Sequence, residues 1–227
     1  MSSKHPQEVL EPEFLDATRL CHGQTMVGLE RMYATWQAVR YVGMAKISGA
    51  LVECGVWRGG NLMLMALALL QLGQGNREIW GYDTFEGMPM PTSHDVDIQG
   101  RLAAEQMQRE TGEGWCAASE SVVKENLRRI PYPQDQFRLV PGRVEETIPR
   151  QMPRKIALLR LDTDWYESTR HELIYLFPLL EHGGVIIVDD YGHWQGAKRA
   201  VDEYFSGDGP RILLNRIDYT GRIGVKL

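Results

Sequence analysis

Aspartates end two apolar runs in the second half of the chain. Asp162 ends the run 156–162, and the pair Asp189 and Asp190 ends the run 185–190. Short apolar runs of this kind are typical of strands that are buried on both faces of a parallel sheet. We therefore expect the three carboxyl groups to stand at strand ends, where open α/β sheets bind ligands.

The segment between the two runs, 166–181, is predicted to be a helix, so the runs form a strand-helix-strand unit and are expected to be parallel neighbours. Three carboxylates at adjacent strand ends repel one another. A hard divalent cation with oxygen ligands is a physical reason to keep them together. The spacing favours a metal site at Asp162, Asp189 and Asp190 over the alternative, in which the acids cap helices or bind a ribose.

A glycine-rich turn follows the predicted strand 50–56. Glu53, Gly55 and Gly59 form the pattern acid-x-Gly-x-x-x-Gly, and an apolar helix is predicted over 61–72. A dinucleotide fingerprint needs a glycine where Trp57 stands, so that the backbone can approach a pyrophosphate. Nicotinamide and flavin dinucleotides are therefore excluded, and the pattern instead resembles the first motif of class I methyltransferases that use S-adenosylmethionine.

A second predicted strand, 78–83, also ends in an acid, Asp83. An acid at the tip of the second strand of such a fold accepts hydrogen bonds from ribose hydroxyls. The alternative is a turn aspartate in front of Thr84. Together with the glycine-rich turn, Asp83 favours a nucleoside site.

The remaining pattern predicts one α/β domain over 25–227, preceded by an N-terminal arm, 1–24. The segment 84–118 is long for a loop and rich in glycine and proline, which indicates an active-site lid. The further expected elements are one or two helices in 25–46, helices over 102–110, 121–130 and 195–205, and strands over 136–140, 211–217 and 222–227. The last two strands are expected to form an antiparallel edge of a seven-stranded, mostly parallel sheet with helices on both faces.

Composition bounds the class of protein. With 227 residues the chain is long enough for one large core, and no run approaches the roughly eighteen apolar residues of a membrane span. The net charge of −5 and the lack of a basic cluster argue against nucleic acid as a partner. Cys21, Cys54 and Cys116 are widely spaced, which fits a reducing cytoplasm and neither a disulfide framework nor a zinc site.

Four segments occur in an order that resembles one known family: 51–60, 82–89, 160–169 and 183–191. Together they look like the macrocin O-methyltransferase family, and the match covers about 25–205. The resemblance implies a class I methyltransferase (Rossmann-like) fold, S-adenosylmethionine as cofactor and Mg²⁺ held by Asp162, Asp189 and Asp190. It also implies that Asp164 is the general base, whereas the residue alone could equally cap the helix that begins near Tyr166.

The same resemblance suggests how a cofactor would be bound. Glu53 would lie near the sulfonium and the amino-acid part, Trp57 and Asn61 near its carboxylate, and Asp83 would bind ribose. Gly142, Arg143 and Val144 would flank the adenine, although Arg143 could equally be solvated. The full set of predicted cofactor residues is Met26, Glu53, Gly55, Trp57, Asn61, Asp83, Thr84, Gly142, Arg143, Val144 and Asp162.

The expected acceptor is a hydroxyl of a small natural product, and specifically a sugar hydroxyl with a second hydroxyl beside it. Catechol-type and caffeoyl-CoA-type enzymes share the fold but carry a lysine three residues after the first metal aspartate, where this chain has Trp165. A phenolic acceptor and a protein that only binds S-adenosylmethionine stay open as alternatives.

We expect a homodimer or larger homo-oligomer, with no membrane partner. His193 either faces the substrate cleft or merely precedes the last helix.

Overall fold

The computed structural model describes residues 7–109, 114–207 and 209–227. Its centre is a seven-stranded sheet with the order β3-β2-β1-β4-β5-β7-β6. The first five of these strands are parallel, and β7 and β6 form an antiparallel edge. The strands are β1 (Ala50–Cys54), β2 (Ile79–Asp83), β3 (Phe137–Pro141), β4 (Ile156–Leu161), β5 (Leu180–Val188), β6 (Asn215–Arg216) and β7 (Arg222–Val225).

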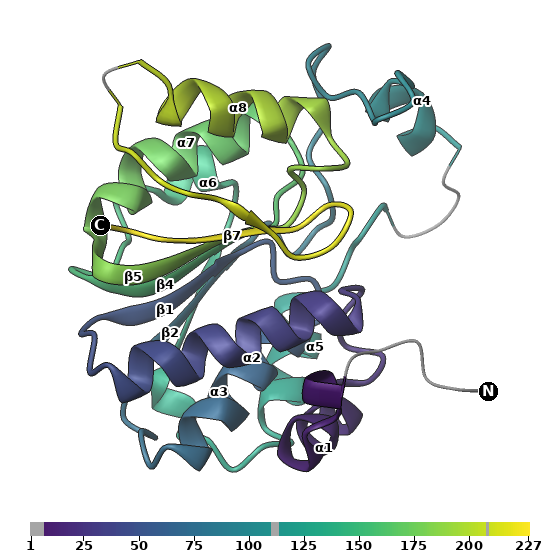
Figure 1. Ribbon diagram of the computed structural model, residues 1–227. Helices are drawn as coiled ribbons and strands as arrows, with labels where there is room; N and C mark the ends of the chain where they lie inside the picture. The colour runs from purple at the N-terminus through teal and green to yellow at the C-terminus, as the bar shows by residue number, and fades with distance from the viewer. Residues whose placement is uncertain (1–6, 110–113, 208) are drawn as a thin grey trace.

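Helices cover both faces of the sheet (Figure 1). One face carries α1 (Pro12–Cys21), α2 (Leu29–Met44), α3 (Gly60–Gln71) and α5 (Glu120–Leu127), and the other carries α6 (Val144–Thr147), α7 (Tyr166–Leu176) and α8 (Gln195–Phe205). The short helix α4 (Ala103–Met107) stands apart from both layers. Among the described residues there are also three short 3-10 helices, at Gln7–Leu10, Gln134–Gln136 and Phe177–Leu179. None of the helices within the described ranges is long and apolar enough to cross a membrane.

Alternation along the central strands builds a core on each face. Leu51 of β1 pairs in register with Leu158 of β4, and Leu158 with Val185 of β5; all three belong to the core beneath α2 and α3. The residues that follow them, Val52, Leu159 and Ile186, point to the opposite face and join the core beneath α7 and α8. Burial on both faces explains why these strands have apolar sequences without polar alternation.

The order of the strands determines where a ligand can bind. The chain runs outward from β1 to β2 and β3, and then returns to continue on the other side of β1 with β4 and β5. A crevice forms at the carboxyl ends of the strands where the order reverses, here between β1 and β4. The backbone N–H of Asp162 donates to Cys54 O at 2.9 Å, and that of Asp189 donates to Leu161 O at 2.9 Å. Both acids therefore stand at this edge, as predicted.

Several element boundaries differ from the predicted ones. The helix predicted over 166–181 ends at Leu176, because Pro178 has no N–H with which to continue it. Strand β5 consequently begins at Leu180, ahead of the predicted run 185–190, and includes Gly183 and Gly184. Of the strand predicted over 211–217 only β6 forms. The helix expected over 102–110 is limited to α4, and residue 110 lies outside the described residues.

The segment expected as an N-terminal arm packs on the domain from α1 onward. Phe14 of α1 is fully buried and its ring contacts Tyr33 and Trp36 of α2, with centroids 5.1 and 5.9 Å apart. Glu11 accepts hydrogen bonds from Tyr33 Oη at 2.7 Å and from Arg40 Nη1 at 2.7 Å. Residues 11–21 are thus part of the core layer.

The segment 84–118 is fixed to the domain where it is described. Asp95 and Asp97 are fully buried within it. Isolated β-bridges pair Val96 with Leu102 and Asp97 with Trp194. The segment is thereby attached beside the first turn of α8, and its function as a lid stays a prediction.

Candidate functional site

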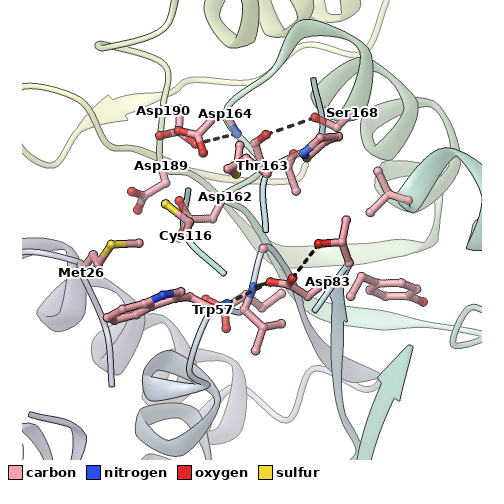
Figure 2. A pocket seen from close by; sticks show the side chains of 18 of the residues that line it. Met26, Trp57, Asp83, Cys116, Asp162, Thr163, Asp164, Ser168, Asp189 and Asp190 are labelled. Atoms are coloured by element: carbon pink, nitrogen blue, oxygen red, sulfur yellow. Dashed lines mark hydrogen bonds between the residues drawn. The ribbon is translucent and has the colours of Figure 1, made fainter. Parts of the chain in front are cut away.

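One cavity of about 470 Å³ lies at the carboxyl ends of the parallel strands. All of the residues predicted from the sequence line it: Met26, Glu53, Gly55, Trp57, Asn61, Asp83, Thr84, Gly142, Arg143, Val144, Asp162, Asp164, Asp189 and Asp190. Figure 2 shows Trp57 and Asp83 on one side of this pocket and Asp164, Asp189 and Asp190 on the other, with Asp162 between them. We call the side around Asp162, Asp164, Asp189 and Asp190 the acidic half, and the side around Glu53, Trp57, Asn61 and Asp83, where the sequence predicts a nucleoside, the nucleoside-sized half.

The acidic half gathers the three predicted metal ligands. One carboxylate oxygen from each of Asp162, Asp189 and Asp190 lies within 4.8 Å of the others. Asp189 is buried, and the backbone N–H of Asp164 donates to Asp190 Oδ2 at 3.2 Å. Oxygen donors at this spacing suit a small, hard divalent cation.

Arg160 lies directly beneath this cluster, and the sequence analysis overlooked it inside an apolar strand. Its side chain is fully buried in β4, and its Nη1 donates to Glu53 Oε1 at 3.0 Å. The guanidinium also contacts the carboxylates of Asp162 and Asp189. A charged residue within a strand that is buried on both faces was the available signal, because such a residue needs partners of opposite charge.

Arg31 of α2 is a second unpredicted member of the site. Its guanidinium pairs with Asp189, and its Nε donates to Asp218 Oδ2 at 2.9 Å. Thr220 Oγ1 donates to the backbone oxygen of Asp189 at 2.7 Å. The turn between β6 and β7 thus holds Asp189 from the other side.

The site holds more carboxyl groups than guanidinium groups. Five carboxyl groups face two guanidinium groups: Glu53, Asp162, Asp164, Asp189 and Asp190 against Arg31 and Arg160. Burial raises the pKa of Asp189 to about 7, although Arg160 opposes this rise. Burial, with repulsion from Asp164, raises the pKa of Asp190 well above its ordinary value. An added cation would relieve this repulsion and favour the ionised carboxylates.

Asp164 does not cap the helix that follows it. The N-cap of α7 is Trp165, and the N–H of Tyr166 instead donates to Asp95 Oδ1 at 2.8 Å. Asp164 has a left-handed backbone (φ 62°), and its Oδ1 accepts a hydrogen bond from Trp194 Nε1 at 2.6 Å. Burial, and then repulsion from Asp162, raises the pKa of Asp164 to about 7. The capping alternative is wrong, and the capping residue comes from the segment 84–118.

The glycine-rich turn between β1 and α3 is shaped by close contacts. A Cβ on Gly55 (φ 83°) would stand 1.9 Å from Asp162 O, so only glycine fits where the two strand ends meet. Asp83 Oδ2 accepts hydrogen bonds from the backbone N–H groups of Val56 and Trp57 at 2.7 and 2.9 Å. Its Oδ1 accepts from Phe85 N at 2.8 Å, which is the turn contact considered as an alternative. Asp83 therefore supports two turns in addition to lining the pocket.

Glu53 and Asn61 offer buried acceptors to the nucleoside-sized half. Their side chains are nearly inaccessible, and burial raises the pKa of Glu53 to about 8. Glu53 Oε2 and Asn61 Oδ1 have no hydrogen-bond partner among the described residues. Buried oxygens of this kind normally have a donor, which the ammonium group of a ligand would supply.

The far end of the same half is more open. Gly142 N donates to Asp83 O at 2.9 Å, which places the turn after β3 beside the tip of β2. The Arg143 side chain is 52% exposed, and its Nε lies 3.5 Å from Glu145 Oε2. Arg143 is therefore in contact with solvent as well as with the pocket. Met26 is 60% exposed at the rim.

An aromatic wall that the sequence analysis did not identify borders the acidic half. Trp115, Trp165 and Trp194 pack edge to face, with ring centroids 5.0 to 6.1 Å apart. Trp115, Trp194 and His193 line the cavity, which answers the question left open for His193. The order of the chain holds no periodic signal for this cluster, because its members come from three separate loops.

Comparison with known proteins agrees with this geometry. The sequence model of the family described as macrocin-O-methyltransferase (TylF) matches residues 12–223. The 8-demethyl-8-(2,3-dimethoxy-alpha-L-rhamnosyl)-tetracenomycin-C 4'-O-methyltransferase of Streptomyces olivaceus is 37% identical over 199 residues, which are 87% of this chain and 73% of that protein. The demethyldecarbamoylnovobiocin O-methyltransferase of Streptomyces niveus is 37% identical over 183 residues, 81% of this chain and 68% of that protein.

Solved structures show the same fold. The O-methyltransferase NovP superposes with a TM-score of 0.79 at 33% identity, covering 89% of this chain and 82% of that chain. The calicheamicin methyltransferase CalS11 superposes with a TM-score of 0.62 at 21% identity, covering 97% of this chain and 93% of that chain, which shows a shared fold. The predicted fold class and the predicted family resemblance are both confirmed. The chain belongs to the macrocin O-methyltransferase family and is an O-methyltransferase.

Proposed function

We propose that this O-methyltransferase uses S-adenosylmethionine and Mg²⁺ to methylate a hydroxyl of a small natural product, on a sugar that carries a second hydroxyl beside it. The observation that carries the proposal is the trio Asp162, Asp189 and Asp190, whose oxygens lie within 4.8 Å in the same cavity as the half-buried Asp164. Each part of the proposal rests on a different part of that cavity.

The cofactor part rests on the nucleoside-sized half. Glu53 Oε2 and Asn61 Oδ1 would accept hydrogen bonds from the ammonium group of the methionine part, which would give both buried oxygens a donor. Asp83 and the turn at Gly142 would hold the nucleoside part, with Trp57 beside it. S-adenosylmethionine supplies an electrophilic methyl group when it is bound.

The metal part rests on the chemistry of the acidic half. Asp162, Asp189 and Asp190 would hold Mg²⁺, whose positive charge lowers the pKa of a hydroxyl bound next to it. Arg31 and Arg160 orient Asp189 from both sides, and carboxyl groups still outnumber guanidinium groups in the site. These arginines therefore position a ligand without replacing the cation.

Asp164 would act as general base. A sugar hydroxyl is far too weak an acid for a carboxylate with a reference pKa of about 3.9 to deprotonate outright, so proton removal must accompany methyl transfer. The burial of Asp164 makes its carboxylate more basic. It stands beside Asp190, where it could take a proton from a hydroxyl in the acidic half.

The acceptor class rests on the relatives and on a missing lysine. The relative from Streptomyces olivaceus is named for a rhamnosyl compound, and that from Micromonospora griseorubida, 29% identical, for mycinamicin III. Trp165 stands where a lysine-assisted phenol mechanism would need its lysine. Both observations favour a glycosylated product of antibiotic biosynthesis over a phenolic acceptor. A protein that only binds the cofactor is disfavoured, because all three metal carboxylates are retained.

The setting in the cell and the assembly are also proposals. The three cysteines are free, as a reducing cytoplasm would keep them. We propose a cytoplasmic homodimer or larger homo-oligomer, which light scattering would test.

The experiment that tests the proposed function is a screen of glycosylated natural products with S-adenosylmethionine labelled at the methyl carbon. The panel should contain rhamnosylated compounds, matched aglycones and simple catechols. Transfer of label to a sugar oxygen in the presence of Mg²⁺ is the expected outcome. Transfer to aglycones or catechols alone would overturn the acceptor assignment.

A further inference from the structure

The indole N–H of Trp194 is hydrogen-bonded to the proposed general base, Asp164. Trp194 is the N-cap of α8, its ring is only 4% exposed, and it lines the cavity. Its Nε1–H donates to Asp164 Oδ1 at 2.6 Å. An indole has one donor and no acceptor, so this bond fixes the direction of the ring and of the carboxyl group together.

Asp164 needs such support because its own backbone does not provide it. The residue has φ 62°, a conformation that side-chain-bearing residues seldom adopt, between strand β4 and helix α7. The N-terminus of α7, which would otherwise hold a preceding aspartate, is occupied by Asp95 from a distant loop. The carboxyl group of Asp164 is thus turned away from the helix and toward Trp194.

Trp194 is itself held in place on several sides. Its backbone N–H donates to Asp190 O at 3.0 Å, and the next N–H, of Gln195, donates to Val96 O at 2.8 Å. Its ring packs edge to face on Trp165, with centroids 5.0 Å apart, and on His193 at 4.8 Å. A donor fixed by packing costs no reorganisation when the reaction occurs.

We propose that Trp194 is a positioning residue that aims the Asp164 carboxylate at the acceptor hydroxyl. The inference rests on the proposed role of Asp164 as general base and adds the group that orients it. The indole is neutral, so it orients the carboxylate without neutralising it as an arginine would. The segment 84–118, through its bridge to Trp194, then supports the base in addition to any function as a lid.

Trp165 provides a matched control. It belongs to the same aromatic cluster, its ring is 3% exposed, and its Nε1 donates a hydrogen bond of 2.9 Å. The acceptor of that bond is the backbone oxygen of Pro89 rather than a carboxylate, and Trp165 does not line the cavity. Trp165→Phe therefore removes an equally buried indole N–H from the same cluster, while it keeps an aromatic ring against Trp194 and the hydrogen bond from Trp194 to Asp164.

The test compares Trp194→Phe, Trp165→Phe, Asp164→Asn and the double variant Trp194→Phe with Asp164→Asn. The acceptor is one that the wild type methylates in the labelled-cofactor screen, and S-adenosylhomocysteine and Mg²⁺ are the binding probes. Trp194→Phe should lower kcat by about 10- to 100-fold, because it removes part of the roughly 10²- to 10⁴-fold contribution of a general base. The variant should bind both probes as the wild type does. Trp165→Phe should stay within about threefold of wild type, and both Phe variants should lose similar thermal stability.

The double variant separates orientation from general damage. If Trp194 acts through Asp164, Trp194→Phe should have no further effect on kcat in the Asp164→Asn background. Equal losses in both backgrounds, or equal kcat for the two Phe variants, would overturn the inference while leaving the base assignment standing. Asp164→Asn with near wild-type turnover would overturn the base assignment itself. A crystal structure adds a readout independent of any acceptor: the Asp164 carboxyl group should turn in Trp194→Phe and keep its place in Trp165→Phe.

Discussion

Single residues in this protein owe their properties to neighbours that are distant in sequence. Asp189 contacts Arg31 of α2 and Arg160 of β4, and the turn after β6 holds its backbone oxygen. Asp83, expected as a ribose ligand, also supports two turns with both of its oxygens. Asp83 thus both stabilises the turns and lines the pocket, so a substitution at this position changes both functions at once.

Loss of a metal ligand should stop turnover without loss of the cofactor site. Asp189→Asn and Asp190→Asn each replace one carboxylate ligand of the trio, so turnover should vanish in both variants. Excess chelator should also abolish the turnover of the wild type. Added Mg²⁺ should restore the wild type and neither variant. S-adenosylhomocysteine affinity should stay within about threefold, measured by calorimetry. Asp16→Asn, at an exposed position on α1, is the control. Full activity in excess chelator would show that the three carboxylates are structural.

Arg160 and Arg138 form a second pair for comparison, since both are arginines on strands with carboxylate partners. Arg160 is buried and contacts three carboxylates, whereas Arg138 pairs with Glu78 at 3.1 Å and is 45% exposed. Arg160→Met leaves the buried Glu53 without its counter-charge and Asp189 with Arg31 alone, and it should cost about 3–5 kcal/mol in the free energy of unfolding. Arg138→Met should cost at most about 1 kcal/mol. Urea unfolding measures both, and equal losses would contradict the role of Arg160 as buried counter-charge.

At the scale of elements, the segment 84–118 is joined to the first turns of α7 and α8. Asp95 accepts from Tyr166 N at the start of α7, and it also accepts from Thr92 N at 2.7 Å. The bridge between Asp97 and Trp194 joins the same segment to the start of α8. The same loop thus contacts the first turns of both helices that flank the acidic half.

Asp95→Ala should therefore affect both stability and the loop. Loss of the cap should cost roughly 1–2 kcal/mol, and amide hydrogen exchange should accelerate in residues 92–107 and in the first turn of α7. Ser119→Ala removes the cap of α5, where Ser119 Oγ accepts from Val122 N at 3.5 Å, and is the control. That variant should lose stability with no change in exchange near α7. Unchanged exchange in Asp95→Ala would show that Asp95 does not anchor the segment.

At the scale of the whole molecule, the strand order divides the site between two halves of the sheet. Strands β1, β2 and β3 contribute the residues of the nucleoside-sized half, and β4 and β5 contribute the acidic half. The two halves meet at the β1–β4 junction, where Gly55 lies against Asp162 and Arg160 donates to Glu53. Because the proposed metal ligands all belong to the acidic half, the binding of cofactor and of metal should be separable.

S-adenosylhomocysteine should bind to the folded protein in excess chelator, because the first half of the sheet is complete without a cation. At a ligand concentration of about 100 times Kd, the free energy of unfolding should rise by roughly 2.7 kcal/mol, which denaturant unfolding detects. Asp83→Ala should weaken binding by roughly 1–3 kcal/mol, since hydrogen-bonding groups of turn and ligand lose their acceptor. Absence of any binding by folded wild-type protein would contradict the cofactor assignment.

Much of the architecture could be predicted from local pattern. The strands at 50–56, 78–83 and 156–162 were evident because burial in a parallel sheet leaves short, mostly apolar runs, and α8 begins and ends as predicted. The predicted end of α7 was wrong because Pro178 cannot continue an α-helix. Strand β6 is also shorter than its apolar sequence indicated.

The sequence by itself determined the fold class, the family and the edge of the sheet at which Asp162, Asp189 and Asp190 meet. Parallel strands bring their carboxyl ends together whatever the details of packing, so acids at strand ends are informative without coordinates. Only the tertiary structure decided what surrounds those acids. Arg31 reaches Asp189 across 158 residues of chain, and Trp194 reaches Asp164 across 30. Such pairs follow from how helices and loops pack over the sheet, and no local spacing encodes them.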